Sequence, residues 1–186
     1  MQQLLNFINQ YTHLEKATIY ALEKRVEFES FRKNELILKQ GIIANKVWFI
    51  TKGLVRKFYY HEGKEVTTWI HAENEMCTSM HSYFQKKPSE ENIQAIEDAE
   101  LISLSYEKSL ELNIYPEFNT FSQELLTKQF ACIDEFSKKF SLMNASEKYQ
   151  ALSEIAPEII KRAKLGYIAS IMGISQETLS RIRAKK

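Results

Sequence analysis

The spacing of apolar residues changes along the chain, and each change predicts a different structure. From Leu4 to Val26 apolar side chains mostly recur every three or four positions, which is typical of an amphipathic helix, with Thr12 and Thr18 as candidate caps. Between positions 28 and 106 short β-branched and aromatic runs replace this spacing, separated by glycines. These runs predict a small sandwich or jelly-roll barrel. The predicted strands cover residues 35–38, 46–51, 54–60, 65–70 and 100–104.

Helical spacing returns after Pro116. A predicted helix over residues 117–143 carries a mostly apolar seam spaced alternately by four and three positions, as in a heptad repeat: Leu126, Phe130, Ile133, Ser137 and Phe140. Such a helix, rising about 1.5 Å per residue, is long enough to pack both on its own barrel and on a second copy, so we expect a homodimer. A short helix over 146–156, capped by Ser146, follows and ends at Pro157. The residues expected at the dimer interface are Leu126, Phe130, Ile133 and Phe140.

Residues 165–182 fit a helix-turn-helix position by position. Ala169 is small where a second helix has to cross, and Gly173 permits the left-handed backbone of a tight turn. Ser175 is placed to cap the second helix. The apolar residues that would hold the two helices together are Ile168, Met172, Ile174, Leu179 and Ile182. The simpler alternative is a helical hairpin with a solvated charged face.

The second helix of this pair would turn a polar face outward, and such side chains can read bases in the major groove. Arg181 can contact guanine O6 and N7, Glu177 can accept from cytosine N4, and Gln176 can pair with adenine or a phosphate. Basic residues nearby would contact backbone phosphates, namely Lys161, Arg162, Lys164, Lys185 and Lys186. The candidate DNA-binding residues are Ser175, Gln176, Glu177, Thr178, Ser180, Arg181, Arg183, Lys164 and Lys185.

The distribution of charge supports this interpretation. The 186 residues carry a net charge of only +1, yet the last 26 hold seven basic side chains and a single acid, Glu177. Residues 1–160 therefore carry a net charge of −5. A basic end on an acidic body suggests that the end meets phosphate. No apolar run is long enough for a membrane span and the start lacks the features of a secretory signal, so we expect a cytoplasmic protein without membrane contact.

The order of parts, a barrel, a long helix and a terminal helix-turn-helix, resembles the Crp/Fnr family of bacterial transcription regulators. The most specific match is the run GISQETLSRI at positions 173–182, and the run FITKGLVR at 49–56 looks like a strand and turn of the family's barrel. Pro88-Ser89 followed by residues 93–98 looks like a branch common in Bacteroidetes.

This resemblance implies an α+β fold with an N-terminal double-stranded β-helix (jelly-roll) barrel, a long dimerisation helix and a C-terminal winged helix-turn-helix. The implied domains are a sensor barrel over residues 1–115, the dimerisation helix over 116–143 and a DNA-binding domain over 144–186. The implied partners are double-stranded DNA, a second copy of the chain and RNA polymerase. A regulator of this kind is not an enzyme.

The segment that would hold a cyclic nucleotide departs from the family's pattern. Family members that bind cyclic AMP use a Phe-Gly-Glu stretch and a Pro-Arg-x-Ala-Thr segment, whereas this chain has Met76-Cys77-Thr78, and Ser89 stands in place of the phosphate-binding arginine. A buried phosphate without a guanidinium partner would be an unpaired anion, so we expect no binding of cyclic AMP. The pocket either takes another small effector or is filled by its own side chains. Candidate pocket residues are Cys77, Thr78, Ser79, Ser82 and Ser89.

Metal and redox chemistry find little support in the sequence. Cys77 and Cys132 are distant and too few for an iron–sulfur cluster or a zinc site without other ligands, so no cofactor is expected. A cupin-type metalloenzyme is a competing hypothesis, because a jelly-roll could bring His61, His71 and His81 together, although their ten-residue spacing lacks the His-x-His pair of such sites. A second alternative is an acidic barrel that binds another protein, with purely structural terminal helices.

Overall fold

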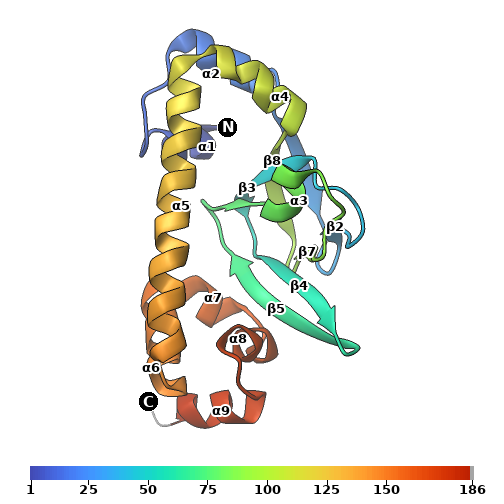
Figure 1. Cartoon of the computed structure of the whole chain (residues 1–186), viewed down its shortest axis with the longest axis vertical. Helices are drawn as coiled ribbons and strands as arrows, with labels where there is room; N and C mark the ends of the chain where they lie inside the picture. The colour runs from blue at the N-terminus through green and yellow to red at the C-terminus, as the bar shows by residue number, and fades with distance from the viewer. Residues whose placement is uncertain (185–186) are drawn as a thin grey trace.

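The computed structural model describes residues 1–184, which form two facing β-sheets, a long helix beside them and helices at both ends of that helix (Figure 1). One sheet has the strand order β1-β8-β3-β6 and the other β2-β7-β4-β5. No strand pairing in the described part joins the two sheets, so of the two predicted alternatives, a sandwich or a jelly-roll barrel, the fold is an open sandwich and not a closed barrel. The strands are β1 (Glu27–Phe31), β2 (Leu36–Leu38), β3 (Lys46–Lys52), β4 (Val55–His61), β5 (Lys64–His71), β6 (Met76–Cys77), β7 (Asn92–Ala95) and β8 (Ala99–Ser105).

Strand β3 is buried on both faces, which explains its continuous apolar run. Trp48 and Ile50 point between the two sheets, where they pack with Val55, Ile93 and other apolar side chains. Phe49 points the other way, into a cluster formed with the N-terminal helices and the start of the long helix. Two apolar layers thus meet at β3, and burial of apolar area on both faces fixes the sandwich against its helices.

The helical start predicted for the N-terminal region consists of two helices. Helix α1 (Gln2–Ile8) ends at Asn9, and α2 (Lys16–Glu23) starts after Glu15, its N-cap residue. Both helices bury apolar residues in the same cluster, and the chain has to turn between them to do so. Thr18 is not a cap; it is fully buried, and its hydroxyl donates to Glu117 at the start of the long helix.

Three strands and three short helical segments between α2 and the long helix escaped the prediction. Strand β1 alternates polar and aromatic residues, all of them exposed or half-buried, so it lacks the apolar signal of a core strand. Strand β6 has two residues, and β7 pairs on both sides in the middle of its sheet. The missed helical turns are α3 (Met80–Gln85), α4 (Tyr106–Glu111) and η1 (Leu112–Ile114).

The second half of the chain is helical. The predicted long helix is α5 (Pro116–Leu142), and it runs beside the sandwich from the N-terminal helices to the C-terminal ones (Figure 1). Then follow α6 (Ala145–Ile155), α7 (Pro157–Arg162), α8 (Leu165–Met172) and α9 (Gln176–Ala184). None of the described helices is both long and apolar enough to cross a membrane.

Three details of this half differ from expectation. Asn144, not Ser146, caps α6, because its side chain accepts from two backbone amides while Glu147 closes a capping box. Pro157 begins α7 instead of only ending the preceding helix, as suits a residue without an amide hydrogen. Within residues 1–184 no strand follows β8, so the expected wing does not form there.

Candidate nucleic-acid interface

Helices α8 and α9 meet at a sharp corner formed by Gly173. This glycine has a φ of 67°, in the left-handed region that costs other residues energy. The amide of Ile174 donates to the carbonyl of Ala169 at 3.0 Å, and that of Gly173 donates to Ser170 at 3.1 Å. These two bonds form a Schellman motif that ends α8 and turns the chain toward α9. The predicted role of Gly173 at the turn is confirmed.

A small apolar core holds the corner rigid. Leu179 of α9 is fully buried between Ile168 and Met172 of α8, and Tyr149 and Leu152 of α6 close the cluster. Ile174 and Ile182 are half-buried at its margin, so the five residues predicted to hold the two helices together do share one core. Ala169, 2% exposed, lies in the same cluster.

The opposite face of α9 is polar and open. Its exposed side chains are Gln176, Glu177, Ser180, Arg181 and Arg183, whereas Thr178 is half-buried. The hydroxyl of Ser175 accepts from the amide of Thr178 at 3.1 Å, which confirms Ser175 as the N-terminal cap. Hydrogen bonds from its own amide and from Ser175 lower the pKa of Glu177, so its carboxylate stays charged. Lys164 is exposed just before α8, and Lys185 and Lys186 lie outside the described residues.

Gln176 differs from its neighbours on α9 because its side chain packs on α8. Its Oε1 lies 3.1 Å from the point that a Cβ atom would occupy at Gly166. Gly166 therefore leaves room for this side chain. Nothing near Gly166 in the sequence predicts this contact, because it depends on the angle between α8 and α9.

Helix α8 also docks on the edge strand β5 of the sandwich. The hydroxyl of Ser170 accepts from the backbone amide of Thr67 at 2.8 Å and donates to its carbonyl at 3.2 Å. One turn earlier, the ring of Tyr167 lies 4.2 Å from the guanidinium of Arg56, whose other side is covered by Phe58 at 3.9 Å. Arg56 is only 2% exposed and also pairs with Glu65 at 2.6 Å. These contacts tie the α8–α9 corner to the sandwich, which sequence reasoning missed.

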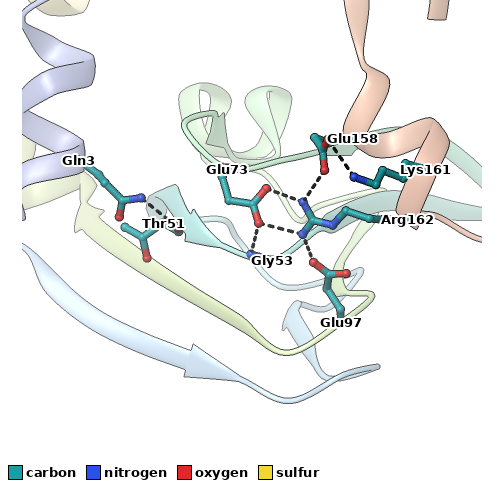
Figure 2. A network of polar contacts seen from close by, with 8 residues as sticks. All are labelled: Gln3, Thr51, Gly53, Glu73, Glu97, Glu158, Lys161 and Arg162. Atoms are coloured by element: carbon teal, nitrogen blue, oxygen red, sulfur yellow. Dashed lines mark hydrogen bonds and ion pairs between the residues drawn. The ribbon is translucent and has the colours of Figure 1, made fainter. Parts of the chain in front are cut away.

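Arg162 at the end of α7 makes a second tie. Figure 2 shows its guanidinium between carboxylates from three elements. Two of its nitrogens reach the two oxygens of Glu73, both at 2.8 Å, and it also contacts Glu97; Glu158 lies 3.7 Å away. In this arrangement both terminal nitrogens of Arg162 are bonded to carboxylates of the sandwich, so its contact with DNA phosphate stays a prediction.

The apolar seam of α5 is largely exposed. The exposed fraction is 77% for Phe130, 60% for Ile133 and 40% for Leu126, which are high values for such side chains. Phe140 belongs elsewhere, because it stacks on Phe136 at 4.5 Å and packs on the core of the C-terminal helices. The described chain therefore leaves three of the four predicted seam residues uncovered.

The predicted effector residues do not form an open pocket. All five are buried, and the serine and threonine hydroxyls already have partners: Thr78 donates to the Lys46 carbonyl, Ser82 to the Lys87 carbonyl, and Ser89 lies 3.1 Å from Ser79. A nearby cavity of about 250 Å³ includes only Ser79 from this set. Its other lining residues are Tyr59, His81, Glu90 and Glu91.

The three histidines of the metalloenzyme hypothesis are not brought together. His61 lies at the exposed tip of the β4–β5 hairpin, His71 contacts Glu75 at 2.9 Å, and His81 is exposed on α3. Across residues 1–184, no group of three or more His, Cys, Asp or Glu side chains is arranged to hold a metal ion.

Comparison with known proteins agrees with this architecture. Residues 28–112 match the cyclic nucleotide-binding domain family. FixK2 from Bradyrhizobium japonicum is 17% identical, with a TM-score of 0.69 over 86% of this chain and 83% of that one. The c-di-GMP-responsive global regulator CLP from Xanthomonas campestris is 14% identical, with a TM-score of 0.68 over 92% and 91% of the two chains.

The catabolite activator protein of Thermus thermophilus is 20% identical, with a TM-score of 0.57 over 92% of this chain and 83% of that one. No curated protein matches the chain in sequence. At these identities the solved structures establish a common fold. Residues 28–112 thus match the cyclic nucleotide-binding domain family, and the chain shares its overall fold with these three solved structures.

Proposed function

We propose that this protein is a sequence-specific DNA-binding transcription regulator that reads its site with α9. The observation that carries the proposal is the division of α9 into two faces. Leu179 is buried against α8, while Gln176, Glu177 and Arg181 remain exposed on the other side and are free of the sandwich. A short helix held rigidly from behind, with a polar front, has the form needed to enter a major groove.

The chemistry of the exposed face suggests how bases would be read. Arg181 supplies a planar pair of donors for guanine, and Glu177, ionised at neutral pH, supplies an acceptor for cytosine N4. Lys164 at the start of α8 would hold a phosphate and set the register. In this proposal residues 144–186 form the DNA-binding domain, 116–143 the dimerisation helix and 1–115 the sensor.

A homodimer through α5 is part of the proposal. Exposed Phe130 and Ile133 side chains would be removed from water by the same helix of a second copy, which gives a two-fold interface. Two recognition helices related by such an axis would read an inverted repeat, with half-sites roughly 34 Å apart.

We further propose that the sandwich does not bind cyclic AMP. Ser89 is 2% exposed and its hydroxyl donates to the Glu91 carbonyl at 2.7 Å, so the place of the missing arginine is occupied by internal hydrogen bonds. Glu90 and Glu91 line the cavity beside it and would repel a phosphate. Calorimetry with cyclic AMP should give no heat of binding, and micromolar affinity would contradict this part of the proposal.

The test of function is a DNA titration. Fragments bound by the purified protein are selected from genomic DNA, and the affinity for the enriched site is measured over a series of salt concentrations. We expect a specific site and a steep fall of affinity with salt, because basic side chains release counterions from the phosphates. No DNA affinity even at low salt would favour the protein-binding alternative.

A further inference from the structure

Arg162 lies two residues before Lys164, the proposed phosphate contact, yet its side chain faces the sandwich. We propose that its contact with Glu73 and Glu97 is an autoinhibitory latch: it holds the DNA-reading helices on the sandwich and withholds Arg162 from DNA phosphate. The inference rests on the proposed function, because it assigns Arg162 a second, DNA-bound position.

The sandwich side of the latch is preorganised. Glu73 lies in the turn after β5, and its Oε1 also accepts from the amide of Gly53 at 2.7 Å, which fixes the carboxylate where Arg162 meets it. Both oxygens of Glu73 are used by Arg162, and such bidentate pairs are strong and directional. Glu97 comes from the turn after β7, so two separate turns of the sandwich each supply a carboxylate that binds Arg162 of α7 (Figure 2).

The charges decide the direction of the effect. In the latched arrangement Arg162 lies among Glu73, Glu97 and Glu158, and Lys161 contacts Glu158 at 3.9 Å, so three carboxylates face two cations and this patch carries more negative than positive charge. A DNA phosphate approaching it is repelled by carboxylates and finds both terminal nitrogens of the guanidinium already bonded to Glu73 and Glu97. When α7 is released from the sandwich, the guanidinium of Arg162 would be free to bind one more phosphate, next to the contact of Lys164.

The rest of the docking surface is compatible with release. Its apolar part is a cluster in which Ile159 of α7 meets Leu54, Ile70 and Ile96, with Tyr167 and Ile171 of α8 packed against it; Tyr167 also contacts Arg56. Its backbone part is the pair of bonds between Ser170 and Thr67, which water can replace once release exposes the strand edge. The ion pair is the component for which DNA phosphate competes directly.

The test is the double variant Glu73→Gln/Glu97→Gln, which keeps side-chain shape and an acceptor for the Gly53 amide. We expect its DNA affinity to rise several-fold and the plot of log affinity against log salt to steepen by about 0.9, the value for one added phosphate contact. Adding Arg162→Ala should return the slope to that of the unaltered protein. The matched control is Glu124→Gln/Glu154→Gln, which removes two exposed carboxylates elsewhere.

Docking is measured without DNA by hydrogen exchange at the Thr67 amide, which Ser170 protects in the latched form. Faster exchange in the double variant together with unchanged or lower DNA affinity would overturn the autoinhibitory role while leaving the proposed function intact. An equal gain of DNA affinity in the control variant would show that the effect comes from the change in net charge and not from the latch. If the double variant fails to fold, Glu97→Gln alone serves, with the same two readouts. Failure of every form, including the unaltered protein, to bind DNA would reject the proposed function itself.

Discussion

Ser170 and Thr67, 103 positions apart in the sequence, exchange two hydrogen bonds through a single hydroxyl. The hydroxyl satisfies both backbone groups of Thr67 on β5, the strand at the edge of its sheet. Edge strands leave such groups unpaired and invite pairing with other chains, so α8 protects this edge.

Ser170→Ala should lower the free energy of unfolding by about 1 to 3 kcal/mol, because Thr67 loses both partners. Denaturant unfolding measures the loss. Ser180→Ala on exposed α9 is the control and should change stability little. Equal effects of the two substitutions would show that the Ser170 contact does not hold in solution.

Arg181→Ala should relax sequence preference. If Arg181 contacts one guanine, the substitution should lower discrimination at a single base-pair position by about 1 to 3 kcal/mol. Competition binding with singly substituted sites measures this. Lys164→Ala is the contrasting variant, and it should weaken all sequences alike and flatten the salt dependence by about 0.9. A uniform loss with Arg181→Ala would instead make Arg181 a backbone contact.

Phe130→Asp and Ile133→Asp should each yield monomers. A charge placed in an apolar interface is desolvated without a partner, so the dimer is lost. Sedimentation gives the oligomeric state, and operator affinity should fall in parallel. Ala131→Asp, on the same turn but off the seam, is the control and should remain dimeric. Persistence of the dimer in both seam variants would place the interface elsewhere.

Acid should weaken the contact between Glu73 and Arg162. The hydrogen bonds from Arg162 lower the pKa of Glu73 from 4.5 to about 2. A carboxylate whose pKa is lower in the folded state stabilises the fold above its ordinary pKa and loses that contribution as pH falls toward the folded value. Between pH 5 and 2 the unaltered protein should therefore lose more stability than Glu73→Gln, by on the order of 2 kcal/mol given partial exposure. Parallel pH profiles would contradict this.

Gly53→Ala should be strongly destabilising. Gly53 has a φ of +95°, and an added Cβ would lie 2.7 Å from the Asp98 carbonyl and 2.9 Å from the Ala99 Cα. Backbone strain and overlap together should cost roughly 2 to 4 kcal/mol. Gly41→Ala is the control, because its φ of +88° is similar but its surroundings are open, so only the strain remains, about 1 kcal/mol. Thermal unfolding of both variants separates the two contributions.

Much of the fold was accessible from sequence because its signals are local. The apolar runs at β3, β4 and β5, the heptad spacing of α5 and the Gly173 corner each follow from neighbouring residues. Strand β1 was missed because its partner β8 lies some seventy residues further along and pairing replaces the weak local preference. The break between α1 and α2 likewise depends on tertiary packing.

The candidate interface was predicted only in part, because some of its contacts join residues far apart in the sequence. The polar face of α9 follows from its helical period, but the two ties to the sandwich do not. Arg162 looked like one more member of a basic cluster, and nothing near it in sequence indicates Glu73 or Glu97. Phe140 fits the seam by spacing, yet its ring stacks on Phe136 and packs on the core of the C-terminal helices instead.

The contact between Gly166 and Gln176 limits how operator specificity can be re-engineered. Because the space above Gly166 holds the Gln176 amide, a larger residue at 166 would push that side chain toward the duplex. Conversely, a shorter residue at 176 would leave a gap over α8, and the angle at which α9 approaches the bases would be less tightly fixed. Libraries that aim at new target sequences should therefore vary positions 166 and 176 together.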